Sequence, residues 1–349
     1  MTPSSLTSRP LPPSDLEHVL GHASEAFEAL RGARLLITGG TGFFGRWLLE
    51  SLAHADRRMN LLVSATVVTR NAGAFRRVAP HVTSWEGLDL VESDVRILQL
   101  PGESFSHMIH AATEASAALN DGNPLEMYAV CAAGTERALE VARDSGVARF
   151  LLASSGAVYG RQPPDLERVP ESWTGAPDPL EVNSAYAQGK RAAEWYGAAF
   201  GQGGQLEVVT ARAFAFVGPL LPMDAHFAAG NFLRDALAGG PIRVGGDGTP
   251  YRSYLYAADL AAWLWVLLIQ GQAGRAYNVG SDRSVSIADL AKTVAELRPG
   301  CEVSVAKLPV PGAPAARYVP SIDRARQELG LDVWVPLPDA LRRTYEWAR

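Results

Sequence analysis

The stretch ITGGTGFFG at residues 37–45 decides the fold of this chain. It spaces Gly39, Gly42 and Gly45 as GxxGxxG between the apolar run ARLLIT and the helix-like segment FFGRWLLESLAH. Glycines allow a tight turn and let a pyrophosphate approach the backbone, while the N-terminus of the following helix attracts an anion. A purely structural turn is the alternative. In its strand–turn–helix setting the motif predicts a dinucleotide-binding site.

The chain continues this alternation of short apolar runs and helix-length segments. The later runs are LLVSATVVT, GLDLVESDV, HMIHAAT, ARFLLASS, EVVTAR and AYNVGS, and a long helical pattern covers residues 123–146. Continuous apolar strands separated by helices are typical of a parallel sheet covered on both faces. The sequence therefore predicts a Rossmann-type, doubly wound α/β fold, whose ligands bind beyond the carboxyl ends of the strands.

The second half of the chain is less regular. Pro- and Gly-rich pieces such as VGPLLPM and GGPIRVGGDGTP interrupt the alternation and indicate a smaller lobe built from separate segments. The expected parts are an N-terminal arm (1–31), a dinucleotide-binding Rossmann domain (32–216, completed by 253–280) and a C-terminal substrate-binding lobe (217–252 and 281–349).

Two further segments give local expectations. SDLE at 14–17 has the form of a capping box, which predicts a short helix within the N-terminal arm. LAAWLWVLLI at 260–269 is the most apolar stretch, but about 20 apolar residues are needed to cross a bilayer. We therefore expect a buried helix there and no association with a membrane.

The composition excludes some classes of partner. The chain has 349 residues and a formal net charge of −5, which argues against a nucleic-acid-binding protein because such proteins carry a large cationic surface. An anionic small substrate stays compatible, since a few arginines suffice. The two cysteines, Cys131 and Cys301, lie far apart and the histidines show no metal-ligand spacing. We expect a reduced, cytoplasmic protein without a metal site.

The residues after the second and third strands bear on the choice of cofactor. An acidic residue that holds the adenosine ribose of NAD usually follows the second strand, but VVTRN places Thr69 and Arg70 there. Arg70 could pair with the 2′-phosphate of NADP, stack on adenine with NAD bound, or be a solvated loop residue. Asp94 is placed to accept a hydrogen bond from the adenine amino group, although an ordinary loop aspartate would look the same. NAD and NADP both stay open.

Groups that can move a proton occur in two other stretches. NSAYAQGKRAAEWYG (183–197) places Tyr186 and Lys190 four residues apart at the start of a predicted helix, so both side chains lie on one face. A tyrosine with a pKa of about 10 is a poor base at neutral pH, but a nearby ammonium favours the phenolate. ASSGAVYG (153–160) adds a serine at a strand end that can hold the reacting oxygen. A surface Tyr–Lys pair is the alternative to this proton-transfer site.

Several motifs match one known family in its order: TGGTGFFG, HAAT, SSGAVYG, YAQGK, FVGP, RSYLYAADL and YNVGS. From Arg34 to the C-terminus the chain resembles the extended short-chain dehydrogenase/reductase family, in its nucleotide-sugar epimerase and dehydratase branch. The resemblance implies an NAD(P)-dependent enzyme that moves a hydride between a sugar carbon, usually C4, and the nicotinamide. It also implies a nucleoside-diphosphate sugar as substrate and a homodimer formed by two long helices from each subunit.

The resemblance assigns roles to individual residues. Tyr186 takes or gives the proton on a sugar oxygen, and Lys190 also holds the nicotinamide ribose. Arg252 is a diphosphate ligand, since an arginine fork fits phosphate oxygens, with a structural ion pair as the alternative. The expected catalytic residues are Ser155, Tyr186 and Lys190. The expected cofactor contacts are Gly39, Gly42, Phe43, Phe44, Gly45, Arg70, Asp94, Ala111, Ala112, Tyr186 and Lys190. The expected substrate contacts are Ser155, Tyr186, Asn231, Arg243 and Arg252.

Three departures from the family pattern bear on the reaction. Cys131 and Ala215 stand where the family commonly has asparagines, which puts a standard uridine or thymidine diphosphate sugar in doubt. In the 4,6-dehydratases that resemble this chain, an Asp–Glu pair follows the hydroxyl residue and eliminates water from C5 and C6. Here that pair is Gly156 and Ala157, neither of which can exchange a proton. Glu114 is a candidate substitute for the missing carboxylates.

These observations favour an NAD(P)-dependent nucleotide-sugar epimerase in which Tyr186 acts as the acid and base. A nucleotide-sugar 4-ketoreductase uses the same groups and is the nearest alternative. A 4,6-dehydratase or decarboxylase on the same scaffold and a non-catalytic dinucleotide-binding protein are the others. The base and the sugar are not defined by the sequence.

Overall fold

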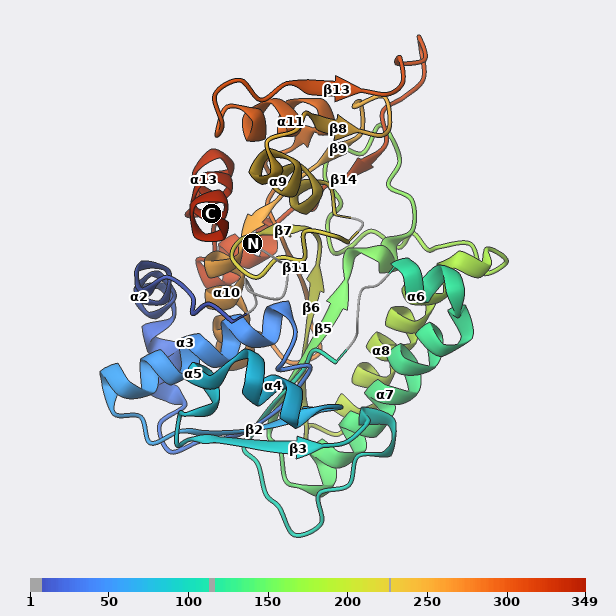
Figure 1. Cartoon of the computed structure of the whole chain (residues 1–349). Helices are drawn as coiled ribbons and strands as arrows, with labels where there is room; N and C mark the ends of the chain where they lie inside the picture. Colours follow the sequence, from blue (N-terminus) through green and yellow to red (C-terminus); the bar gives the residue numbers. More distant parts are fainter. Residues whose placement is uncertain (1–7, 113–116, 226) are drawn as a thin grey trace.

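A parallel sheet of seven strands forms the centre of the fold. The computed structural model describes residues 8–112, 117–225 and 227–349. The strand order is β11–β6–β5–β4–β1–β2–β3, and all neighbours run parallel (Figure 1). The predicted doubly wound α/β fold is confirmed. The strands are β1 (Arg34–Thr38), β2 (Ser64–Thr69), β3 (Leu88–Glu92), β4 (His107–His110), β5 (Arg149–Ser155), β6 (Glu207–Ala213) and β11 (Ala276–Val279).

Helices cover both faces of the sheet. Leu35 and Ile37 of β1 belong to the same buried cluster as α3 and α10, whereas Leu36 belongs to the cluster formed with α7 and α8. This alternation follows the two-residue period of a strand. The elements around the sheet are α3 (Phe43–Met59), α4 (Ala72–Val78), α5 (Pro80–Thr83), η1 (Val95–Ile97), α6 (Ala117–Gly122), α7 (Pro124–Asp144), η2 (Gly156–Tyr159), η3 (Val182–Ser184), α8 (Ala185–Gly201) and α10 (Ala257–Gln270).

The order of the strands reverses between β1 and β4. The chain builds β2 and β3 on one side of β1, and β4, β5 and β6 on the other. Ligands of doubly wound sheets bind at such a switch point, outside the carboxyl ends of the strands. The glycine turn after β1, Ala111 after β4 and Ser155 at the end of β5 all lie at this edge.

Smaller elements lie beyond the carboxyl ends of the strands (Figure 1). They form three small sheets, ordered β12–β9–β14, β13–β8 and β10–β7. In the first of these, Tyr318 of β14 pairs with Arg252 of β9. The domain boundaries within the chain stay a prediction. The elements are β7 (Phe216–Val217), α9 (Ala228–Ala238), β8 (Ile242–Val244), β9 (Tyr251–Arg252), β10 (Leu255–Tyr256), β12 (Val285–Ser286), α11 (Ile287–Ala295), β13 (Val303–Val305), β14 (Arg317–Tyr318), α12 (Asp323–Leu329) and α13 (Leu337–Ala348).

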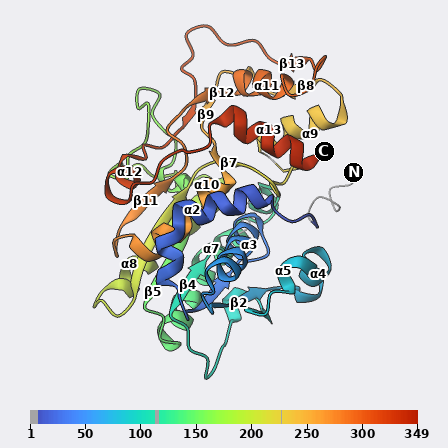
Figure 2. The same cartoon turned by 90° about the vertical axis from the view of Figure 1, so that its left-hand side faces the viewer.

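The N-terminal helix is longer than the sequence indicated. α2 runs over Pro13–Ala29 and packs along α10 and α3 (Figure 2). Proline is favoured at the first helical position, so the helix begins at Pro13 and Ser14 lies inside it; the predicted capping box was wrong. Buried Asp15 ties the helix to the rest of the chain. Its carboxylate accepts hydrogen bonds from the Tyr256 hydroxyl at 2.5 Å and the Arg343 guanidinium at 3.1 Å.

The most apolar stretch forms the buried helix α10, as predicted. Trp263 and Trp265 of this helix are fully buried, and the Trp265 ring N–H donates to the Ser51 hydroxyl at 2.9 Å. Over the part of the chain that the structure describes, no helix has both the length and the apolar surface needed to cross a membrane.

Candidate active site

The glycine turn after β1 has no room for side chains at two positions. Gly39 has a positive φ of 74°, and a Cβ there would lie 2.3 Å from the Ala111 carbonyl oxygen. A Cβ on Gly45 would lie 2.3 Å from the Cα of Gly40. Distances this short are forbidden, so the close packing of β1, β4 and α3 requires glycine at both positions.

The start of α3 provides an anion-binding position. Gly42 precedes this helix, and among the described residues no side chain caps it. The first N–H groups of the helix, from Phe43 and Phe44 onward, therefore face the turn without a side-chain acceptor. Such a helix start fits the pyrophosphate of a dinucleotide. Ala111 and Ala112 follow β4 beside this turn, so the residues expected to contact the cofactor after β1 and after β4 lie close together.

The expected adenosine contacts lie next to each other after β2 and β3. Asp94 accepts hydrogen bonds from the Arg96 backbone N–H at 2.9 Å and from its guanidinium at 2.8 Å. Arg96, with a smaller contribution from the nearby charge of Arg70, lowers the pKa of Asp94 to about 2. Both carboxylate oxygens of Asp94 therefore accept hydrogen bonds from a residue of the same loop, as in an ordinary loop aspartate. Its contact with adenine and the contact of Arg70 with the cofactor stay predictions.

The structure brings Ser155, Tyr186 and Lys190 together. Ser155 ends β5, and its hydroxyl oxygen accepts from the Ala157 N–H at 3.1 Å. Tyr186 and Lys190 occupy the first turns of α8, and the Lys190 Nζ donates to the Ala153 carbonyl at 2.6 Å. Lys190 is only 3% exposed. Burial raises the pKa of Tyr186, a hydrogen bond with Ser155 opposes this rise, and burial lowers the pKa of Lys190.

An aromatic ring fills the space beside Gly156. A Cβ at this position would lie 2.7–2.8 Å from three carbons of the Phe214 ring. The ring also packs against that of Tyr318, with the ring centroids 4.7 Å apart and the planes tilted by 36°. The turn after Ser155 therefore has no room for a carboxylate at position 156 unless Phe214 moves. Ala157 follows with a methyl group alone, so neither position supplies an acid or base.

Tyr318 is a site residue that the sequence did not reveal. A hydrogen bond with Ser155 lowers the pKa of Tyr318, but burial raises it to about 12. Ser155 thus has a tyrosine partner from α8 and a second one from the small sheet that also holds Arg252. No sequence signal marks Tyr318, because β14 has two residues and follows a Pro-rich loop.

A chain of hydrogen bonds lies behind these groups. Thr135 donates its only hydroxyl proton to the Cys131 carbonyl at 2.7 Å, so it accepts at 3.1 Å from His110 Nε2–H. The other ring nitrogen, Nδ1, then accepts from the Thr38 hydroxyl at 2.7 Å. Burial, with the Lys190 charge, lowers the pKa of His110 to about 3. A neutral imidazole therefore joins the ends of β1 and β4 to α7.

Cys131 lies directly against the Tyr–Lys helix. A Cβ on Gly189 would lie 2.6 Å from the Cβ of Cys131 and 3.4 Å from its Sγ. The thiol is fully buried and interacts electrostatically with both Tyr186 and Lys190. The replacement of the usual asparagine therefore lies within the site. Ala215 packs against the main hydrophobic core, and Glu114 lies outside the described residues.

The expected substrate residues of the smaller lobe line one hollow. Asn231 on α9, Arg243 on β8 and Arg252 on β9 surround a space of about 300 Å³. Two guanidinium groups on one hollow suit an anion such as a diphosphate.

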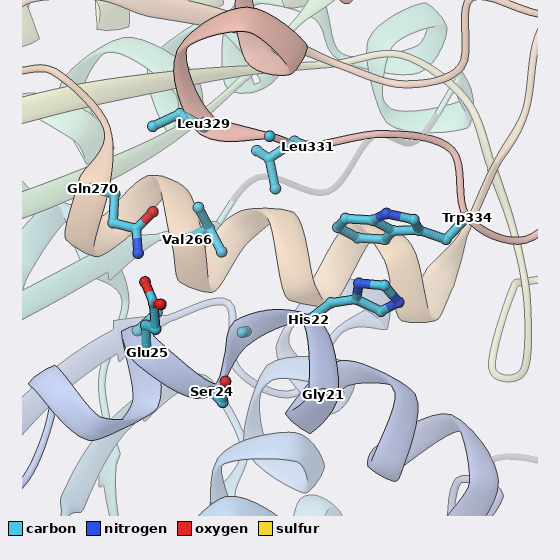
Figure 3. Close-up of a pocket in the computed structure, with 12 residues that line it drawn as sticks. Gly21, His22, Ser24, Glu25, Val266, Gln270, Leu329, Leu331 and Trp334 are labelled. Atoms are coloured by element: carbon cyan, nitrogen blue, oxygen red, sulfur yellow. The ribbon is translucent and has the colours of Figure 1, made fainter.

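A second hollow, of about 210 Å³, lies at the irregular point of α2, where His22 stacks on Trp334 at 3.8 Å (Figure 3). None of the candidate site residues lines this second hollow.

The fold and the grouped side chains define the class of the protein. A Rossmann sheet with a glycine turn at its switch point, and a Ser–Tyr–Lys group at the end of the fifth strand, are features of NAD(P)-dependent dehydrogenases and epimerases of the short-chain type. The chain belongs to the NAD dependent epimerase/dehydratase family, whose model matches residues 35–280. It is an NAD(P)-dependent enzyme.

Comparison with individual proteins supports this assignment. The chain is 31% identical to UDP-glucuronic acid decarboxylase 3 of Arabidopsis thaliana, covering 88% of this chain and 86% of the relative. It is 30% identical to UDP-glucuronic acid decarboxylase 1 of Xenopus tropicalis (90% and 72%). DesIV, a dTDP-glucose 4,6-dehydratase from Streptomyces venezuelae solved with NAD, has 25% identity and a TM-score of 0.76 (90% and 97%). The UDP-glucose 4-epimerase of Thermotoga maritima shares the fold, with 22% identity and a TM-score of 0.74 (90% and 98%).

Proposed function

We propose that the chain is a nucleotide-sugar epimerase in which Tyr186 is the acid and base at C4 of the sugar. The observation that carries this proposal is the composition of the site around Ser155. Ser155, Tyr186 and Lys190 are assembled there for the transfer of one proton and one hydride, with Tyr318 as a second tyrosine beside Ser155. The turn after Ser155 supplies no further acid or base, because Phe214 fills the space beside Gly156. Return of the hydride to the other face of the sugar needs no additional group.

The proposed roles follow from the geometry. When bound, NAD(P) supplies the nicotinamide that accepts and returns the hydride. Tyr186 as phenolate removes the proton of the 4-hydroxyl, and Ser155 holds that oxygen by a hydrogen bond. Burial opposes the phenolate, so it needs positive charge nearby; the Lys190 Nζ lies 6.0 Å from the Tyr186 ring centre. Arg243 and Arg252 bind the diphosphate of the substrate.

Decarboxylation is the second candidate, and the relatives with 30–31% identity favour it. Oxidation at C4 of a hexuronic acid places a ketone β to the carboxylate, and such an acid loses carbon dioxide without a base on the enzyme. Tyr186 would then protonate the product or hold its enolate oxygen. Both candidates share the first oxidation. They differ in the substrate that enters and in the next step, which is return of the hydride to the other face in the epimerase and loss of carbon dioxide in the decarboxylase.

The test is incubation of the purified protein with a panel of nucleotide hexoses and nucleotide hexuronic acids, with products identified by NMR. An epimer without net change of NADH supports the proposal. Carbon dioxide with a nucleotide pentose supports decarboxylation, and NADH consumed in equal amount with a 4-keto sugar supports a ketoreductase. Tyr186→Phe should lower the rate about 10²–10⁴-fold, whereas Tyr196→Phe on the same helix should not. Absence of all products over the panel contradicts the proposal.

We also propose that two copies pair through α7 and α8. Leu125 and Tyr128 on α7 and Trp195 on α8 are 83%, 44% and 66% exposed, which is unusual for apolar side chains of neighbouring helices. A second copy of the same surface would bury them. Trp195→Glu should give monomers in light scattering after gel filtration. Leu308→Glu, at another apolar residue exposed by 89%, should leave the dimer intact. A monomeric wild type contradicts this arrangement.

A further inference from the structure

One partly buried ion pair holds both ends of the turn that carries Ser155. Immediately before this residue, the Ser154 hydroxyl donates to the Glu194 Oε1 at 2.6 Å. At the other end of the turn, the Tyr159 hydroxyl oxygen accepts from the Arg212 Nη1 at 2.8 Å. Glu194 and Arg212 bind each other, so a single unit contacts the strand before Ser155 and the short helix η2 after it.

The geometry of the pair makes it rigid. Arg212 donates to Glu194 from Nη2 at 2.6 Å and from Nε at 3.0 Å, a two-bond arrangement that fixes the relative orientation of both groups. The side chains are only 17% and 16% exposed. Salt screens such a pair much less than a surface pair. The pair connects α8 to β6, the strand next to β5, and thereby fixes the end of β5 from two sides.

Glu194 also influences the protonation of Lys190 in the site. It follows Lys190 by four residues on α8, so the two side chains share a face of the helix. The other titratable groups that face Lys190 are Cys131 from α7, His110 from β4 and Tyr186 from its own helix. Burial lowers the pKa of Lys190, and electrostatic interactions with the Cys131 side chain and the Glu194 carboxylate oppose this shift. Glu194 is the carboxylate within this group.

We infer that Glu194 and Arg212 are positioning residues of the active site, which hold the Ser155 turn and support the ammonium of Lys190. The inference depends on the proposed function only for the roles of Ser155 and Lys190. It predicts two separable effects. Loss of the carboxylate charge should change the pH dependence of the site, and loss of the bonding geometry should change the rate.

Three variants separate these effects. Glu194→Gln keeps the shape and removes the charge, whereas Glu194→Asp keeps the charge and shortens the reach to Ser154 and Arg212. Glu207→Gln is the matched control, because Glu207 pairs with Arg149 across the amino ends of the same strands, β5 and β6. All three are first compared with wild type by circular dichroism and thermal unfolding.

The first readout is the dissociation constant of NADH against pH, which needs no sugar substrate. NADH binding should weaken as Lys190 loses its proton. In Glu194→Gln this weakening should occur at a pH lower by about one unit, the low end of the effect that a nearby opposite charge has on a pKa. Glu194→Asp and Glu207→Gln should follow the wild-type profile. The second readout is kcat on the substrate from the panel, which should fall about tenfold in both Glu194 variants, with KM changed less than threefold, and not in Glu207→Gln.

Several results overturn the inference. It is wrong if Glu194→Gln has the wild-type NADH profile, or if Glu207→Gln shifts the profile as far. If Glu194→Gln does not fold, Ser154→Ala takes its place: it removes only the contact to the turn and should lower kcat without moving the profile. An unchanged kcat in that variant also refutes the positioning role. If the wild type converts no sugar, the proposed function fails, and the NADH profile still decides the role of Glu194.

Discussion

Gly156→Ala should destabilise the protein by about 1–3 kcal/mol, the usual cost of an extra methyl group in a packed site. The new Cβ would lie 2.7 Å from Cζ of Phe214 and 2.8 Å from both Cε atoms. Either the ring or the turn must therefore shift. The ring is confined on its other sides, because its centroid lies 4.7 Å from that of Tyr318 and 6.2 Å from that of Tyr159.

The assay is urea unfolding followed by circular dichroism, with the m-value checked for constancy between variants. Gly21→Ala is the control: it also adds a methyl group, but nothing lies within 4 Å of it, and alanine in the helix α2 should stabilise by about 1 kcal/mol. Phe214→Ala opens the space beside position 156. In that background Gly156→Ala should lose at least about half of its cost.

Two results would refute this reasoning. Gly156→Ala with the stability of the wild type would mean that the turn adjusts without cost. An equal loss in the Phe214→Ala background would mean that the ring is not the group that excludes the side chain.

Further predictions concern the buried polar groups. Thr135→Val should cost about 1–3 kcal/mol in urea unfolding, because it leaves the His110 Nε2–H without an acceptor, and Thr135→Ser should recover most of the loss. Stability should fall as pH drops from 6.5 toward about 3, since the pKa of His110 is about 3 in the folded chain and the unfolded chain binds the proton first; His110→Gln should make this slope shallower. Asp259→Asn should cost about 1–3 kcal/mol by the same measurement, because one carboxylate oxygen binds His18 and the other accepts two backbone N–H groups.

The parts of the site that the sequence predicted are those with a local pattern. The glycine turn joins one strand to the next helix, and Tyr186 and Lys190 are one helical turn apart, so spacing alone places their side chains. Ser155 could be found because it ends an apolar run. All of these depend on contacts within one or two consecutive elements.

The parts that could not be predicted depend on contacts between distant segments. Phe214 and Tyr318 are 104 positions apart in the numbering, and Gly156 is far from both; only the folded sheet places their side chains together. The same holds for Glu194, which has an ordinary helix sequence around it and binds an arginine of β6. The N-terminal helix was misjudged for the opposite reason, because two adjacent prolines overrode a local capping pattern.

The packing of Phe214 changes how the glycine at position 156 is interpreted with respect to the reaction. From the sequence, Gly156 and Ala157 stand where the 4,6-dehydratases that the chain resembles have two acidic residues. In the structure, the ring occupies the space that such a side chain needs, and it packs there against Tyr318 and Tyr159. A carboxylate at 156 therefore requires a smaller residue at 214, and with it a different surface beside Ser155. The absence of a carboxylate at this position, on which the proposed function rests, therefore depends on three packed segments together.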